Sequence, residues 1–168
     1  MIALLVVLAA AAASSSVLTV ALAGEPGDPL VISEVIYGAD GVSPVAGATL
    51  DIHHTDATGH YAPEGQPPRL KGTLVTGADG RYEIRTIRPA PYPGGRIPAH
   101  IHAKVSASAG AWHDIHEYWF ADDPLVTAAM SAPHTSERRF NPIVTVTKGP
   151  DGVWRGERDI RLPEKARR

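Results

Sequence analysis

A chain of 168 residues is long enough for one folded domain and leaves little room for a second hydrophobic core. Its 16 basic and 18 acidic side chains give a formal charge of −2, so the overall charge gives no reason to expect nucleic acid as a partner. Cysteine is absent, which excludes disulfides, thiolate-bound zinc and iron–sulfur clusters. Any metal ion must therefore be held by His, Tyr, Asp or Glu.

The N-terminal segment, residues 1–23, differs in composition from everything after it. Residues 2–23 carry no charge and are mainly Ala, Leu and Val. Ala21-Leu22-Ala23 has the small-x-small form that a signal peptidase accepts, which predicts a signal peptide cleaved before Gly24. No Lys or Arg precedes the run, and the run is long enough to span a bilayer, so an uncleaved N-terminal anchor is the alternative. In both cases we expect residues 24–168 to form an exported domain, secreted after cleavage and membrane-attached only through an uncleaved leader.

From residue 29 onwards the pattern is that of short β-strands, each rich in β-branched or aromatic residues and bounded by Gly, Pro or Asp. With 16 Gly and 15 Pro between them, these runs predict an all-β fold, an antiparallel β-sandwich with immunoglobulin- or transthyretin-like layers and little helix. One helix is expected at residues 123–130, with Pro124 at an early position. Strands are predicted at residues 30–37, 45–53, 70–76, 82–87, 99–106, 115–120 and 143–147, and a turn at 148–152 leads to a last strand at 153–162.

Two turns in the first half of the chain lead to a tyrosine. Their sequences are Asp56-Ala-Thr-Gly-His-Tyr61 and Asp79-Gly-Arg-Tyr82. We interpret them as two similar hairpin turns rather than as an internal repeat.

Two histidines near residue 100 have a spacing that suits a metal ion. On a strand, residues two apart project from the same face, so His100 and His102 point together while Ile101 packs on the other side. Two imidazoles in that arrangement can bind one metal ion. Two hydrogen-bonded strand histidines without a metal would give the same pattern.

A tyrosine lies shortly before these histidines in a loop of restricted conformation. Tyr92 stands between Pro91 and Pro93, and the Gly94-Gly95 turn that follows can fold the loop back towards the strand. Such a loop can aim the phenol at a site. A ring packed on the edge of the sandwich is the alternative.

Together these residues resemble the iron-binding signature of the intradiol ring-cleavage dioxygenases, which include catechol and protocatechuate dioxygenases. The resemblance covers about Leu30 to Pro124 and includes the segment from Asp51 to Tyr61, the Tyr92 loop with its histidines, and the later run from Tyr118 to Pro124. It implies a bound ferric ion, Fe(3+), as the cofactor. The ligands that it implies are Tyr61 and His100 in the ligand plane and Tyr92 and His102 at the axial positions.

The resemblance also implies a reaction, with a small aromatic diol and O2 as the partners. A catechol would lose both protons and bind the iron through both oxygens, and its ring would open between the two hydroxyl-bearing carbons to give a muconate-type diacid. Tyr92 is the expected catalytic residue, because as the displaced ligand it would accept a proton. Tyr82 follows a turn like that of Tyr61 but matches a structural strand position of the family.

Two positions depart from the family pattern near the expected substrate. Ile97 stands where many members have Arg, and the neighbouring Arg96 is either a substrate-binding substitute or a solvated side chain. His116-Glu117 replaces a Thr-Gln pair, so Glu117 either points away from the substrate or favours an uncharged catechol. The sequence leaves open whether the chain forms a homo-oligomer.

A non-enzymatic alternative is a transthyretin-like or carboxypeptidase-regulatory-type sandwich that serves as a binding module. Its hairpins share the pattern of residues 72–92, whereas Tyr61 and residues 98–102 favour the dioxygenase. The adjacent His53 and His54 face opposite ways on a strand, and we interpret them as surface or strand histidines, like the pair at residues 113 and 116.

Overall fold

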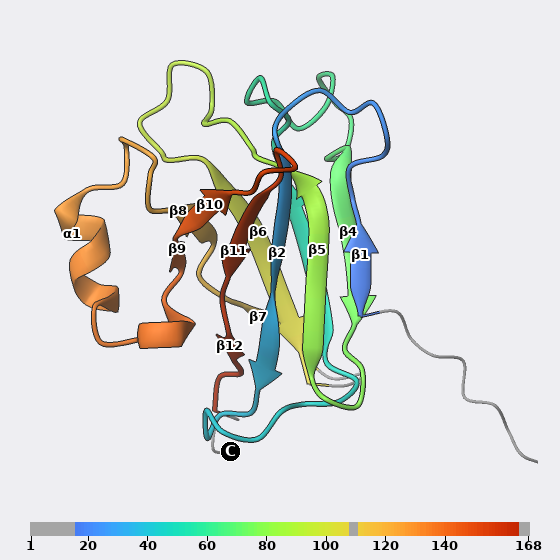
Figure 1. The fold of residues 1–168 in the computed structure, drawn as a ribbon, viewed down its shortest axis with the longest axis vertical. Coiled ribbons are helices and arrows are strands. Elements are labelled where there is room, and N and C mark those ends of the chain that lie inside the picture. Colours follow the sequence, from blue (N-terminus) through green and yellow to red (C-terminus); the bar gives the residue numbers. More distant parts are fainter. Residues whose placement is uncertain (1–15, 108–110, 165–168) are drawn as a thin grey trace, which may run out of the picture.

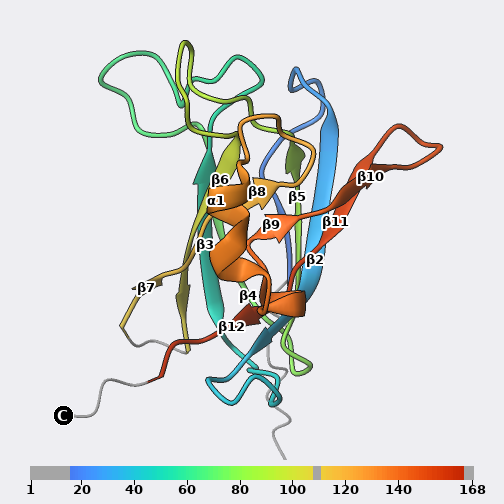
Figure 2. The same cartoon turned by 90° about the vertical axis from the view of Figure 1, so that its left-hand side faces the viewer.

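The computed structural model describes residues 16–107 and 111–164, so most of the predicted leader lies outside the described residues. Two β-sheets pack face to face, with one short α-helix beside them (Figures 1 and 2). This arrangement confirms the predicted β-sandwich with little helix. Within the described ranges, no helix has the length and apolar character needed to cross a membrane.

The first sheet is built around the long strand β2, which pairs antiparallel with β5 and parallel with β11 and β12. These parallel pairs, and that of β1 with β5, depart from the purely antiparallel arrangement that we expected. β11 enters the sheet as the second strand of a hairpin with β10, and this hairpin sets its direction parallel to β2. The spatial order is β1 (Val17–Thr19), β5 (Arg81–Ile87), β2 (Pro29–Tyr37), β11 (Trp154–Glu157) and β10 (Val146–Lys148), with β12 (Ile160–Arg161) also on β2.

The second sheet has β6 near its centre, paired antiparallel with β3 so that His53 lies opposite His102. β6 also pairs with β7 and β8, and β8 pairs parallel with β9. The spatial order is β4 (Leu70–Val75), β3 (Thr49–His54), β6 (His100–Ser106), β8 (Tyr118–Phe120) and β9 (Ile143–Val144), with β7 (His113–Asp114) on β6.

The hydrophobic core lies between the two sheets and follows the alternation of the strands. On β3, Ile52 is fully buried, and on β6, Ile101 and Val105 are fully buried. Because successive strand residues face opposite sides, His100 and His102 lie on the outer face of the second sheet. The loops at the upper end of the sandwich in Figure 1, residues 55–69 and 88–99, extend beyond this end of β3 and β6.

Five predicted elements differ from the observed ones by more than one residue. The strand predicted at 143–147 divides into β9 and β10, which lie in different sheets, and the strand predicted at 153–162 divides into β11 and β12. Helix α1 (Ala128–Ser131) is shorter than the predicted helix at residues 123–130, because Asp123 accepts the backbone N–H of Leu125 in a turn and Thr127 provides the helix cap. The strand predicted at residues 45–53 begins at Thr49, after the turn residue Gly47 (φ 70°), and the strand predicted at 115–120 begins at Tyr118. Two 3-10 turns that we did not predict follow the helix, η1 (Ala132–His134) and η2 (Arg138–Phe140).

Strand β1 lies inside the segment predicted as the leader. It pairs with β5, and its Leu18 packs so closely on Gly72 of β4 that a Cβ at Gly72 would lie 2.8 Å from Leu18 Cδ1. A chain cleaved before Gly24 would lack this strand. The described domain therefore begins before residue 24, and the leader and its cleavage before Gly24 stay predictions.

Candidate metal centre

The four side chains that the sequence singled out as metal ligands converge beside the outer face of the second sheet. His100 Nε2 lies 3.0 Å from His102 Nε2 and 3.2 Å from the Tyr92 hydroxyl oxygen. The Tyr61 hydroxyl lies 3.0 Å from His102 Nε2 and makes a very short contact with the Tyr92 hydroxyl. Two oxygen and two nitrogen atoms therefore surround one point.

The histidines are placed by the start of β6. Asp123 accepts a hydrogen bond of 2.8 Å from the backbone N–H of Ala99, which fixes the entry into the strand. The Nδ1–H of His100 donates to the carbonyl of Pro98 at 2.7 Å. This bond turns His100 Nε2 towards the site and leaves its lone pair free for a metal ion.

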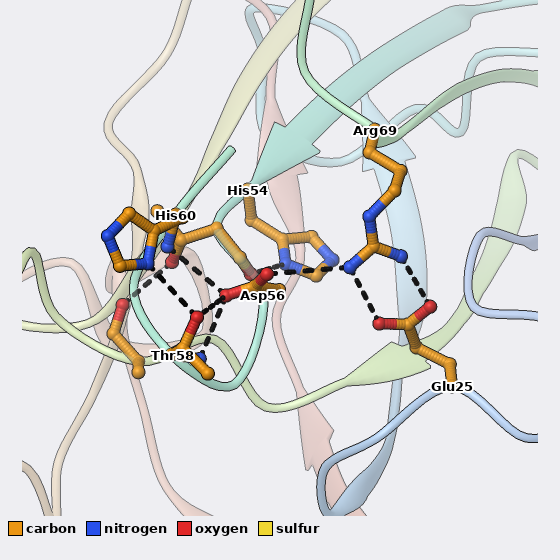
Figure 3. Close-up of polar contacts among 8 residues, drawn as sticks. Glu25, His54, Asp56, Thr58, His60 and Arg69 are labelled. Carbon is orange, nitrogen blue, oxygen red and sulfur yellow. Dashed lines mark hydrogen bonds and ion pairs between the residues drawn. The ribbon is translucent and has the colours of Figure 1, made fainter. Parts of the chain in front are cut away.

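Tyr61 follows the turn that Asp56 organises, and Figure 3 shows the polar contacts of that turn. The Asp56 carboxylate accepts hydrogen bonds from the backbone N–H and hydroxyl of Thr58 and from the backbone N–H of His60. On its other side lies Arg69, which forms a two-pronged ion pair with Glu25. The backbone N–H of Arg69 donates to the Tyr61 carbonyl at 2.9 Å, so the tyrosine is tied to its loop from both sides.

The loop that carries Tyr92 is locked onto the Asp56 turn. The Thr55 hydroxyl donates to the Ala90 carbonyl at 2.7 Å, and the Ala90 N–H donates to the Asp56 carbonyl at 3.1 Å. Gly59 sits so close to this loop that a Cβ there would lie 2.3 Å from the Pro91 carbonyl oxygen. The relative position of the two phenols is therefore fixed by direct backbone contact between their loops.

The electrostatics of the site favour a cation. Burial and the hydrogen bond with Tyr92 raise the pKa of Tyr61, and the negative charge of Glu117 raises it further. A phenolate at this place therefore needs a positive charge beside it. Burial, with the neighbouring His100 and His53, lowers the pKa of His102, which keeps its imidazole neutral and able to bind a metal.

The donor set fits a hard, highly charged ion such as Fe(3+). Phenolate oxygens are hard, anionic donors, and imidazole is a common ligand of iron. Across the part of the chain that the structure describes, no three His, Asp or Glu side chains gather into a metal-binding group. A metal at this point would thus depend on both tyrosine oxygens.

The remaining sequence candidates occupy different surroundings. Tyr82 lies in the core, where its hydroxyl donates to the Arg158 carbonyl at 2.5 Å, so it does not reach the site. Arg96 is exposed and makes no hydrogen bond or ion pair with any residue in the described ranges, and its role in substrate binding stays a prediction. Glu117 places its Oε1 atom 3.6 Å from His102 Nδ1.

The adjacent pair His53 and His54 divides between the site and the core. The His53 ring stacks on that of His102, with centroids 4.6 Å apart and an angle of 19° between the planes. The opposite parity of His54 takes it into the core, where it bonds Thr55 and Thr86. The place of His53 beside the site was missed, because it depends on the register of β3 against β6, for which the sequence carries no direct signal.

Comparison with known proteins identifies relatives over most of the chain. A family model described as dioxygenase matches residues 6–150. The catechol 1,2-dioxygenase 1 of Acinetobacter lwoffii is 32% identical over 146 residues, which are 74% of this chain and 46% of that protein. The hydroxyquinol 1,2-dioxygenase of Rhizobium sp. (strain MTP-10005) is 34% identical over 120 residues, 60% of this chain and 40% of that protein. The chain thus spans about half the length, or less, of these curated relatives.

Solved structures share the fold. The dioxygenase domain of a dioxygenase carbohydrate-binding protein fusion from Streptomyces sp. SirexAA-E superposes with a TM-score of 0.68 at 26% identity, over 88% of this chain and 87% of that one. The catechol 1,2-dioxygenase of Pseudomonas arvilla C-1 has a TM-score of 0.71 at 20% identity, over 96% of this chain and 60% of that one, which shows a common fold. Because the family model covers most of the sequence and the relatives are catechol-type 1,2-dioxygenases, the chain belongs to the intradiol ring-cleavage dioxygenase family.

Proposed function

We propose that the protein is a non-haem Fe(3+) dioxygenase that cleaves catechol-type aromatic diols between the two hydroxyl-bearing carbons. The observation that carries this proposal is the convergence of two phenol oxygens and two imidazole nitrogens in a chain of this family. Relatives named for catechol, chlorocatechol and hydroxyquinol support a small aromatic diol as the substrate. The binding-module alternative does not require such a set of side chains.

The bound ferric ion would supply a Lewis acid that chelates the diol and activates its ring. The protein's own side chains would hold the ion and accept the protons of the diol. Tyr61, tied down by Arg69 and the Asp56 turn, stays in place. Tyr92 is the ligand that we expect the diol to displace; its phenol bonds only to site atoms among the described residues, so once displaced its oxygen can accept a proton from the diol.

The reaction balances without a further reductant. A catechol and one O2 contain all the atoms of a muconate-type diacid, because the bond between the two hydroxyl-bearing carbons breaks and each carbon gains one oxygen atom. The ring carbons supply the four electrons that reduce O2. The protein therefore needs only the diol and O2 as partners.

The test is product analysis with labelled oxygen. Iron-loaded protein should contain about one iron per chain, absorb visible light, and convert catechol, protocatechuate or hydroxyquinol under ¹⁸O2 into a diacid with one label in each carboxyl group. An aldehyde-acid product would mean cleavage outside the diol and would refute the proposal. A spectral shift with catechol but no product would reduce the protein to a catechol-binding module.

Because the two tyrosines are expected to have different roles, the proposal predicts different effects of Tyr92→Phe on iron content and on turnover. This variant should keep part of its iron, because three ligands remain, yet lose at least about 100-fold in turnover, as expected for loss of a proton acceptor. Iron content and single-turnover rates measure the two effects separately. Equal turnover in Tyr92→Phe and wild type would exclude a proton-transfer role for this oxygen.

We also propose that the protein works outside the cytoplasm. The uncharged N-terminal run supports export. Strand β1 supports a mature chain that begins before Val17 rather than at Gly24. Mass spectrometry of the exported protein tests this terminus directly. A mature chain that begins at Gly24 would overturn the terminus before Val17, whereas a protein found only in the cytoplasm would overturn export.

A further inference from the structure

The two histidines of the site differ in what their second ring nitrogen meets. His100 Nδ1 donates to a neutral backbone carbonyl, that of Pro98. His102 Nδ1 faces a carboxylate, that of Glu117, at 3.6 Å. Both histidines turn Nε2 towards the point where the ligand atoms meet. A carboxylate therefore faces the second ring nitrogen of only one of the two imidazoles, that of His102.

The position of Glu117 is set by a buried arginine from the other sheet. Arg158 is 5% exposed, and its guanidinium donates to the carbonyls of His116 at 2.9 Å and Glu117 at 3.2 Å. It also lies over the ring of Tyr118, 4.5 Å from the centroid. One guanidinium nitrogen thus holds the two successive carbonyls of His116 and Glu117, which restrains the backbone from which the Glu117 side chain extends.

The face of the His102 ring is restrained as well. His53 stacks on it at 4.6 Å from strand β3, which opposes rotation of the imidazole. Nδ1 and Nε2 point away from each other across an imidazole ring, so the carboxylate lies behind His102 as seen from the ligand atoms. Glu117 therefore lies on the side of His102 opposite the ligand atoms, and its role in substrate binding stays a prediction from the sequence.

We propose that Glu117 is a positioning residue that accepts the Nδ1–H of His102, fixes its Nε2 towards the metal and strengthens it as a donor. This inference rests on the proposed iron centre. A small rotation of the Glu117 side chain would close the 3.6 Å separation to a charge-assisted hydrogen bond of about 2.8 Å. A carboxylate behind a metal-bound histidine typically contributes about 10- to 100-fold to metal affinity.

The test compares Glu117→Gln and Glu117→Ala with Asp114→Asn, which removes a negative charge from the exposed end of the same segment. Iron affinity is measured by competition with a chelator, and donor strength by the energy of the visible phenolate-to-iron absorption. We expect about a 10-fold loss of affinity in Glu117→Gln, which keeps a neutral acceptor, and up to about 100-fold in Glu117→Ala. The absorption band should shift in both variants, and Asp114→Asn should match wild type.

Urea unfolding of the metal-free variants separates this role from a structural one. Because the Glu117 side chain is 34% exposed, its replacement should leave the unfolding midpoint close to that of wild type. Unchanged iron affinity and an unchanged band in both Glu117 variants would overturn the inference and leave the iron centre standing. A wild-type protein that fails to bind ferric iron would remove the iron centre and this inference together.

Discussion

The turn before Tyr61 and the turn before Tyr82 share their local chemistry but deliver their phenols to opposite environments. Asp56 accepts the backbone N–H of Thr58, and Asp79 accepts that of Arg81, in each case two residues further on. Both turns also contain a glycine with positive φ, at 86° for Gly59 and 71° for Gly80.

The difference arises after the turn. Tyr82 is the second residue of β5, and its parity points it into the core, where it bonds Arg158. Tyr61 enters no strand and remains in a loop, half-buried beside Tyr92. A shared turn motif therefore sets the local backbone, and the structure that follows it decides whether the tyrosine becomes core or ligand.

The largest expected effect separates the two phenols directly. Tyr61→Phe should weaken iron binding by at least about 100-fold and abolish the visible absorption, because an anionic ligand is lost. Tyr82→Phe should leave the iron spectrum intact and lower the free energy of unfolding by about 1–3 kcal/mol, since the buried Arg158 carbonyl loses its donor. Iron titration and urea unfolding of both variants measure this contrast. Loss of the iron spectrum in Tyr82→Phe alone would reverse our assignment of the two roles.

Much of this contrast could be predicted from the sequence, because it depends on local patterns. Alternation placed His100 and His102 on one face, and the turn chemistry placed Tyr61 and Tyr82 after similar turns. The family resemblance then distinguished the two tyrosines. These features involve residues that are close together in the chain, where strand period and turn preference act.

Contacts between distant segments could not be predicted in the same way. The stacking of His53 on His102 requires the register of two strands separated by nearly fifty residues. The hold of Arg158 on Glu117 requires the packing of one sheet against the other. Strand β1 was hidden because its apolar residues also suit a leader sequence. The register and the packing depend on the tertiary fold, which a single sequence reveals only through resemblance.

The two glycines provide the second test of the comparison. Alanine at either position is strained by the positive φ, but only Gly59 is pressed against the Tyr92 loop. A Cβ at Gly59 would lie 2.3 Å from the Pro91 oxygen, whereas a Cβ at Gly80 would lie 3.0 Å from its nearest neighbours. We expect Gly59→Ala to cost about 3 kcal/mol of unfolding free energy and to reduce iron affinity about 10-fold. Gly80→Ala should cost about 1–2 kcal/mol and leave iron affinity unchanged. Equal iron affinity in the two variants would show that contact between the loops does not position Tyr92.

The smallest effect concerns the aspartates themselves and appears as a dependence on pH. Partial burial raises the pKa of Asp56, but hydrogen bonds from Thr58 and His60 and the charge of Arg69 outweigh it and lower the pKa to about 2 (Figure 3). Because the pKa of Asp56 in the folded protein lies below the ordinary 3.8, this carboxylate takes up its proton at a higher pH in the unfolded chain than in the folded one. The carboxylate therefore contributes its full stabilisation, about 2 kcal/mol, above about pH 4 and loses it as the pH falls towards 2. The difference in unfolding free energy between wild type and Asp56→Ala should shrink over that interval. Asp79 lies at an exposed turn, where it accepts the backbone N–H of Arg81. Asp79→Ala should therefore lower the unfolding free energy by less than about 1 kcal/mol at neutral pH. Urea unfolding of the metal-free proteins between pH 2 and 7 measures both, and a constant difference for Asp56→Ala across this range would show that its hydrogen bonds do not stabilise the charged form.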